Sequence, residues 1–269
     1  SVPKMEESTF GTLKHQARLQ IESRGLDRPK FDLIKPPPDG LGLSMLPPAS
    51  RLDVYFDMEG NPLADGGLEY LFGATIIEDG KPKFCEWWAH TNEAEKEAFE
   101  KFIEWCHQRW RKDPRMHVYH YGSYEKTALR RLMGKYGTKE KELDDLLRNG
   151  IFVDIYTIVR QAIRVGEPNY SLKNIERLYR DKRSSDVATA MDSVLAYQNW
   201  VDSNDGNDWE TSKTLSEIRA YNIADCDSTW QLAEWLRQLQ RTCAILFTPA
   251  AAKDTPSSQA SKQRAEASK

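Results

Sequence analysis

The stretch RLDVYFDMEG at residues 51–60 decides the fold, because alternating apolar residues lead into two acids and a glycine. Such alternation, rich in Val, Tyr and Phe, is typical of a strand. Two more strand-like stretches follow after short polar turns, LEYLFGATII at 68–77 and KFCEWWAH at 83–90. Short turns between consecutive strands favour an antiparallel meander.

Helical and strand-like stretches alternate after the meander. A helix is expected from Asn92, which forms a capping-box pattern with Glu95, to about Arg111. The fourth and fifth strands are MHVYHYG at 116–122 and IFVDIY at 151–156; each is reached through helices, which suits parallel pairing with right-handed crossovers. The sequence therefore predicts an α/β fold with a mixed five-stranded sheet flanked by helices. The other helices are expected near 123–135, 139–148, 156–164, 171–180, 187–200 and 212–240.

The chain divides into an arm, a domain and a tail. Residues 1–50 are expected to form an N-terminal arm or linker with a short helix at 13–23. The proline-rich stretch that follows should form neither a helix nor a central strand of a sheet. Residues 51–241 are expected to form the folded domain. The tail at 242–269 holds few apolar residues, so we expect it to be disordered.

The bulk composition excludes few functions. A net charge of -3 does not exclude a nucleic-acid partner, because metal-binding carboxylates offset Lys and Arg in the sum. The four cysteines form no CxxC pair, which argues against structural zinc and favours free thiols in a reducing compartment. The sequence shows neither the apolar core of a secretory signal nor an apolar run of roughly 18–20 residues. We therefore expect a cytoplasmic protein that does not enter a membrane.

A pair of acids ends the first strand. Asp57 and Glu59 are two residues apart, and such residues point to the same face of a strand. Two neighbouring carboxylates repel each other unless a cation or a proton lies between them, so the pair is a candidate metal site. Acid-x-acid pairs are also common at solvated strand ends, and that alternative stays open.

Three more residues are candidates for the same site. Tyr221 and Asp225, at i and i+4 of the last helix, share one face, where a tyrosine can orient a water polarised by a metal on the acid. Glu125 opens the helix after the fourth strand, where the helix dipole favours an anion. An ordinary half-buried tyrosine and an ordinary N-terminal helix acid are the alternatives. In the predicted topology the three places converge at one edge of the central strands.

Together these residues resemble the DEDD class of 3′–5′ exonucleases in its tyrosine branch, a DnaQ-like group with a ribonuclease H-like fold. The first motif matches as Asp57-Met-Glu59, and the third matches as Tyr221-x-x-x-Asp225. The second motif departs from the class, because Glu125 stands where an Asp is usual. Glu is one methylene longer, which affects the geometry of a bound metal.

A narrower resemblance covers most of the chain. The stretch from about Leu13 to Arg241 is similar to a domain of bacterial RecB-like nucleases. The pieces that carry this resemblance are FDMEGNP, GLEYLFGA, WWAH, HVYHYGSYEKTALRRLM, FVDIYTIVRQAI, YSLKNIERLY and YNIADCDSTWQL. That family often joins this domain to a helicase or a second nuclease domain, which are therefore the expected partners besides nucleic acid.

The resemblance implies a nuclease that uses two Mg²⁺ or Mn²⁺ ions, since these ions prefer hard oxygen ligands. Asp57 would bridge both ions, Glu59 and Asp225 would complete the first site, and Glu125 would support the second. One ion would lower the pKa of the attacking water and the other would stabilise the leaving 3′ oxygen. Tyr221 would orient that water. The substrate would be a single-stranded end of DNA or RNA.

Basic residues on two helices are candidates for phosphate contact, although a solvated charged face is the commoner explanation. They are Lys126, Arg130 and Lys173. Asp154 in FVDIY is a further acid, either an outer partner of the metal or, as we favour, a helix cap. The alternative function is a catalytically weak nucleic-acid-binding or scaffolding module of the same fold, which the Glu at position 125 favours.

Overall fold

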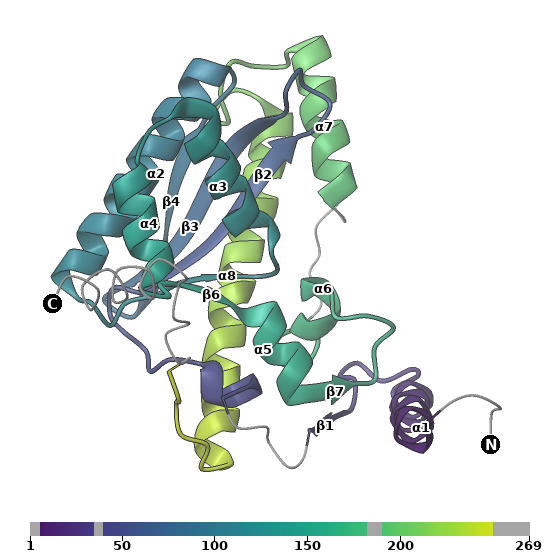
Figure 1. Cartoon of the computed structure of the whole chain (residues 1–269). Coiled ribbons are helices and arrows are strands. Elements are labelled where there is room, and N and C mark those ends of the chain that lie inside the picture. The colour runs from purple at the N-terminus through teal and green to yellow at the C-terminus, as the bar shows by residue number, and fades with distance from the viewer. Residues whose placement is uncertain (1–5, 35–39, 182–189, 250–269) are drawn as a thin grey trace, which may run out of the picture.

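The central strand of the protein is β2 (Val54–Asn61), in a computed structural model that describes residues 6–34, 40–181 and 190–249. Its sheet has five strands in the order β4, β3, β2, β5, β6. β2, β3 and β4 are antiparallel neighbours, and β5 and β6 run parallel to β2. The predicted meander and the mixed α/β sheet are therefore confirmed (Figure 1). The other strands are β3 (Leu68–Glu78), β4 (Lys81–Trp88), β5 (Val118–His120) and β6 (Phe152–Asp154).

Helices cover both faces of the sheet. Successive residues of β2 point to opposite sides, and apolar residues on both sides pack against helices. Phe56 and Met58 pack with the helices of one layer, and Tyr55 packs with the helices of the other. The first layer consists of α2 (Asn92–Lys112), α3 (Tyr124–Tyr136) and α4 (Glu140–Arg148). The second contains α5 (Ile155–Ala162), α6 (Leu172–Glu176), α7 (Ala190–Ser203) and α8 (Lys213–Thr242). None of the helices in the described residues has the length and apolar content needed to cross a membrane.

The arm predicted at residues 1–50 lies against the domain wherever it is described. Its helix α1 (Glu7–Glu22) is longer than expected, and β1 (Phe31–Leu33) pairs antiparallel with β7 (Ile163–Val165). A short 3-10 helix, η1 (Gly42–Met45), packs on α5 within the stretch where no helix was expected. The predicted disorder of the tail falls mostly on residues 250–269, which lie outside the described residues.

Two predicted helix ends and one predicted helix cap are wrong. The helix expected at 156–164 ends at Ala162, because the next three residues pair with β1 as β7. The helix expected at 171–180 continues only to Glu176. The first turn of α2 is capped by Thr91, whose side chain accepts a hydrogen bond from the Ala94 N–H. Glu95 is therefore not part of a capping box; it is buried and forms an ion pair with Lys135 at 2.7 Å.

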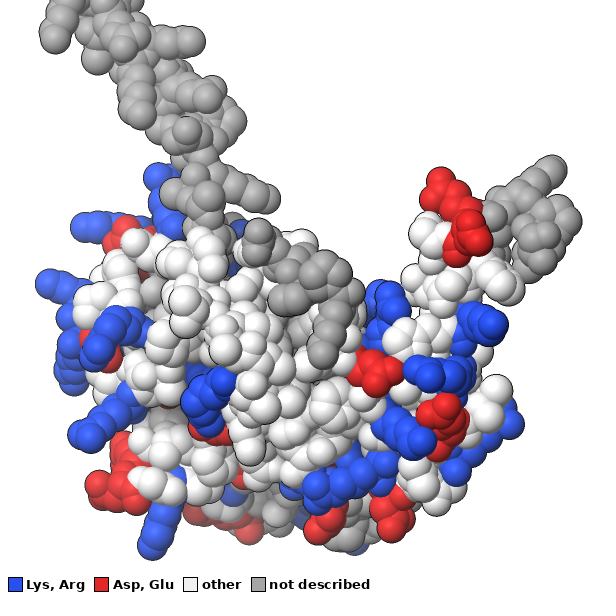
Figure 2. All heavy atoms as spheres, turned by 90° about the horizontal axis from the view of Figure 1, so that it is seen from below, with Lys and Arg blue, Asp and Glu red and all other residues white. Residues whose placement is uncertain are grey.

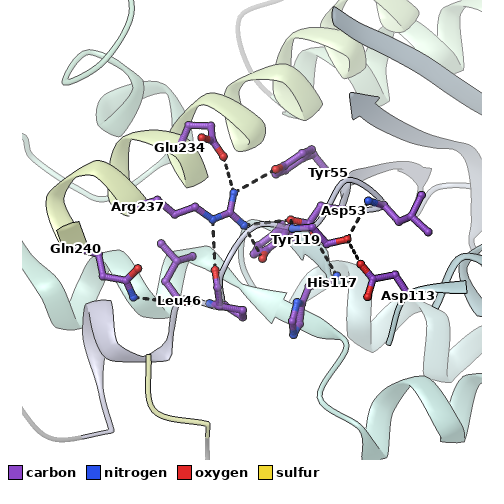
Figure 3. Close-up of polar contacts among 12 residues, drawn as sticks. Leu46, Asp53, Tyr55, Asp113, His117, Tyr119, Glu234, Arg237 and Gln240 are labelled. Atoms are coloured by element: carbon purple, nitrogen blue, oxygen red, sulfur yellow. Dashed lines mark hydrogen bonds and ion pairs between the residues drawn. The ribbon is translucent and has the colours of Figure 1, made fainter. Parts of the chain in front are cut away.

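A buried arginine fixes the C-terminal half of α8 on the sheet (Figure 3). Arg237 is 3% exposed, and its guanidinium donates to Tyr119 Oη at 2.7 Å and to Asp53 Oδ2 at 3.2 Å. It also lies over the Tyr119 ring and donates to Tyr55 Oη at 3.4 Å and to Glu234 Oε1 at 2.6 Å. Burial raises the pKa of Asp53 to about 6, against the opposing effect of the guanidinium. One cation thus joins α8 to two strands.

Replacing Arg237 with Ala is expected to lower the free energy of unfolding by about 3 kcal/mol or more, because Asp53 would be left as a buried charge without its cation. Urea denaturation measures this change. Glu234→Ala is the matched control, since Glu234 bonds the same guanidinium but its side chain is 46% exposed; we expect it to cost under about 1 kcal/mol. Equal losses in the two variants would contradict this account.

Candidate active site

Asp57 and Glu59 lie on the face of β2 that α8 covers. They pair across the sheet with Gly73 and Leu71 of β3, and Asp57 accepts a 2.7 Å hydrogen bond from Asn222 of α8. The neighbouring residues of β2 point into the opposite core, so the predicted shared face of the two acids agrees with the structure. Asp57 is half-buried and Glu59 is buried. The pair is therefore not a solvated strand end.

The glycine of FDMEG is needed for packing beside this pair. The register of β2 against β3 shifts between Glu59 and Gly60, as in a bulge. A Cβ at position 60 would lie 2.3 Å from Glu69 Oε2 and 2.6 Å from Tyr124 Oη. Any larger residue would displace the Tyr124 hydroxyl, which donates to the Glu69 carboxylate at 2.9 Å. Side chains of β3 and α3 thus approach Gly60 closely.

α8 brings Tyr221 and Asp225 to the same place. The Tyr221 hydroxyl is hydrogen-bonded to Asp225, one helical turn away. The pKa of Tyr221 lies well above its usual range, first because the side chain is buried and then because Asp225, Glu59 and Asp57 are all near it. Three carboxylates from two elements therefore surround one tyrosine, which is the convergence that the sequence predicts for these four residues.

Glu59 is the acid of this cluster whose carboxyl is hardest to ionise. Burial, and then the nearby Asp225, raise its pKa to about 8. Hydrogen bonds from Ser193 of α7, at 2.7 Å, and from Asn222 oppose the rise. A bound cation would supply the missing positive charge and would favour the ionised form.

Glu125 has a different neighbour. Its carboxylate is buried at the start of α3, where Oε2 lies 3.4 Å from Nδ1 of His120, the last residue of β5. His120 is the partner that the ion pairs of the described residues give to Glu125. The structure thus brings four of the predicted site residues together and places the fifth beside a histidine.

Only one of the three predicted basic residues has a described contact with the carboxylate cluster. Lys173 of α6 lies at the site, with its Nζ 4.7 Å from the centre of the Tyr221 ring. Lys126 is half-buried and Arg130 is exposed, both on α3 and away from these contacts. Asp154 caps α5 by accepting from Thr157 N–H, so the favoured assignment of this acid is confirmed.

Two residues of the site were missed by the sequence reasoning. Asn222 directly follows Tyr221 in YNIAD, so its closeness to the acids was visible, but an asparagine is an ordinary helix residue. Ser193 joins Glu59 to Tyr70, whose hydroxyl lies 2.7 Å from the serine oxygen. Nothing in its local pattern indicates this role, because it depends on how α7 packs over β2 and β3.

The oxygen-rich cluster has the chemistry of a site for a hard divalent cation. Asp57, Glu59 and Asp225 offer carboxylates, and burial of Glu59, together with the nearby Asp225, raises the pKa of its carboxyl. Among the described residues, however, no three His, Cys, Asp or Glu side chains already stand close enough to enclose an ion. The donor set therefore fits such a cation, while the arrangement is more open than a finished metal cage.

Comparison with protein-family models matches residues 54–237 to the model described as RNase_H superfamily. The chain belongs to the RNase H superfamily. No curated protein and no solved structure matches the chain. The matched span runs from the start of β2 to Arg237 in α8, so this RNase H superfamily domain contains every predicted site residue. The superfamily indicates a nuclease-type hydrolase fold, whose members generally use divalent metal ions.

Substituting Glu59 with Gln is expected to stabilise the metal-free protein at pH 8 by up to roughly 4 kcal/mol. The folded state holds the Glu59 proton up to about pH 8, whereas the unfolded chain releases it near 4.5. The stability of the wild type therefore falls as pH rises between these values, and Gln removes this loss. Denaturation in EDTA at pH 4 and pH 8 measures it. Equal stabilities of the two proteins at pH 8 would contradict the expectation.

Proposed function

We propose that the protein is a metal-dependent nuclease that hydrolyses phosphodiester bonds as a 3′–5′ exonuclease. The observation that carries this proposal is the group of three carboxylates, Asp57, Glu59 and Asp225, around Tyr221 in an RNase H superfamily domain. The finer activity also rests on the resemblance of these residues to the tyrosine branch of the DEDD exonucleases.

Two Mg²⁺ or Mn²⁺ ions are the proposed cofactors. Asp57, Glu59 and Asp225 would hold them, and Glu125 would support the second ion after turning away from His120. Bound there, the ions would activate the attacking water and stabilise the leaving oxygen. Because the described carboxylates do not yet enclose a cation, side chains of the site would move when the ions bind.

Tyr221 and Lys173 have roles that follow from their own positions. The raised pKa of Tyr221 keeps its hydroxyl protonated at neutral pH, so the phenol stays a hydrogen-bond donor in the middle of the acids. Such a group orients a water beside Asp225. The Lys173 ammonium lies against the same ring, where it can attract a phosphate that approaches the carboxylates.

An open groove near the site supports a single-stranded substrate. It has a volume of about 650 Å³ at the carboxyl ends of β5 and β6, and its lining includes Tyr121, Tyr156 and Tyr170. It also includes Ser171, two residues before Lys173. Tyrosine rings stack on unpaired bases, and stacking tolerates any base. By contrast, on the face in Figure 2 the Lys and Arg side chains alternate with Asp and Glu, so that face offers no uniform basic surface.

A catalytically weak nucleic-acid-binding or scaffolding module is the second candidate. Two observations favour it: Glu125 replaces the usual Asp, and the described carboxylates do not form a finished metal cage. Association with a helicase or a second nuclease domain, and a cytoplasmic location, remain predictions from the sequence.

Digestion of labelled single strands tests the proposed activity. With Mg²⁺ or Mn²⁺ we expect stepwise loss of nucleotides from the 3′ end of DNA or RNA, and no loss in EDTA. Asp57→Ala should lower the rate at least about 1,000-fold, because it removes the ligand proposed to bridge both ions. Arg148→Ala is the control, since this side chain is 69% exposed and forms an ion pair with Asp144 on α4, outside the carboxylate cluster.

The outcomes separate the two candidates. Digestion that persists in Asp57→Ala would show that the carboxylate site is not the one that cleaves. Binding of the strand without cleavage in either metal would favour the binding module.

Tyr156→Ala is expected to weaken single-strand binding about tenfold, because one base would lose an aromatic ring on which to stack. Fluorescence anisotropy with a labelled oligonucleotide in Ca²⁺ or EDTA measures this affinity without relying on cleavage. Tyr136→Phe serves as a control, because Tyr136 hydrogen-bonds Glu95 on the α2 side of the molecule. An unchanged affinity in Tyr156→Ala would remove the groove from the proposed substrate path.

A further inference from the structure

Asn222 stands between the two acids of the first motif and is completely buried. Its side-chain nitrogen donates to Asp57 Oδ2 at 2.7 Å, and the amide also hydrogen-bonds Glu59. The NH₂ end of the amide therefore faces the acids, because it is the end that donates to Asp57. A single side chain on α8 therefore touches both acids of β2.

The opposite end of this amide faces a glycine. A Cβ built at Gly73 of β3 would lie 1.6 Å from Asn222 Oδ1 and 2.8 Å from its Cγ. Gly73 is also the cross-strand partner of Asp57, and its carbonyl accepts from Cys226 Sγ at 3.3 Å. Glycine in a strand interior costs stability, and it often marks a close approach of another group. Here the approaching group is the Asn222 amide.

We propose that Asn222 is a positioning residue that bridges Asp57 and Glu59 before any cation arrives, and that Gly73 provides the space for it. The expected consequence is tighter metal binding, and this part of the inference rests on the proposed function. A bridge made by one rigid amide sets the distance between two acids that would otherwise repel each other. Asp in its place would add a third negative charge, and Gln would extend too far for the space beside Gly73.

The contact itself is tested without metal. In EDTA, a double-mutant cycle of Asn222→Ala and Asp57→Ala measures their coupling through urea denaturation. Loss of a hydrogen bond to a charged group predicts a coupling of about tenfold or more in the unfolding equilibrium constant. Additive effects of the two substitutions would overturn the bridge, whether or not the protein binds metal.

The consequence for metal is tested with Gly73. Calorimetric titration with Mn²⁺ is expected to show at least about tenfold weaker binding in both Gly73→Ala and Asn222→Ala. In Gly73→Ala the new methyl group displaces the Asn222 amide. The double variant Gly73→Ala/Asn222→Ala should regain part of the stability that Gly73→Ala loses, since the contact of the new methyl group with the amide is gone and only its 2.9 Å contact with Phe84 Cζ remains. It should not regain Mn²⁺ affinity. Recovery of both would show that Asn222 only fills space and would overturn the proposal.

A matched control separates stability from positioning. Ser228→Ala removes another buried polar side chain of α8, one that hydrogen-bonds Glu176 outside the carboxylate cluster. It should lower stability and leave Mn²⁺ affinity unchanged; an equal loss of affinity would count against a specific role for Asn222. A wild-type protein that shows the coupling but binds no Mn²⁺ would contradict the proposed nuclease function without contradicting the contact of Asn222 with the two acids.

Discussion

The packing of α8 across β2 is the contact on which the rest of the molecule depends. Two side-chain contacts hold it, one just before the strand and one in the middle of the strand. Just before β2, Asp53 bonds Arg237, and farther along the strand Asp57 bonds Asn222. The two helix positions are 15 residues apart, about 22 Å along a helix axis. Because a helix of this length is stiff, the contacts of Arg237 also fix the position of Tyr221 and Asp225 of α8 relative to the sheet.

The buried arginine and the buried acids have opposite consequences for stability. Arg237 has two carboxylates, two phenol hydroxyls and a carbonyl as acceptors, so its charge is compensated inside the protein. Glu59 has hydrogen-bond donors, Ser193 and Asn222, and its burial raises its pKa. One cluster thus holds the fold together, while the other is costly to keep ionised. Such a combination is typical of a functional site built on a rigid frame.

The sequence predicts the sheet and the acidic cluster well, and it does so for a physical reason. Periodicity places Asp57 and Glu59 on one face of a strand, and Tyr221 and Asp225 on one face of a helix, so each pair follows from local geometry. What remains hidden depends on contacts between distant segments. β1 and β7 are three-residue strands that exist only as a pair, and no local pattern marks either of them.

The same limit applies inside the site. Ser193 meets Glu59 across 134 positions of the chain, and Asn222 meets Gly73 only because α8 crosses β3 at that point. A glycine in the middle of an apolar strand was a visible signal, but the group that approaches it was not. Glu125 was placed by analogy with a motif, whereas its recorded neighbour in the fold is His120.

The pairing of β1 with β7 determines whether an edge of β7 is exposed to solvent. Ile163 and Val165 of β7 are buried, and β1 is the partner that the described sheet gives to this strand. Without the segment that contains β1, the backbone donors and acceptors of β7 would form an open edge next to apolar side chains. Such edges recruit strands from other molecules and lead to aggregation. The segment that contains β1 therefore covers one edge of β7.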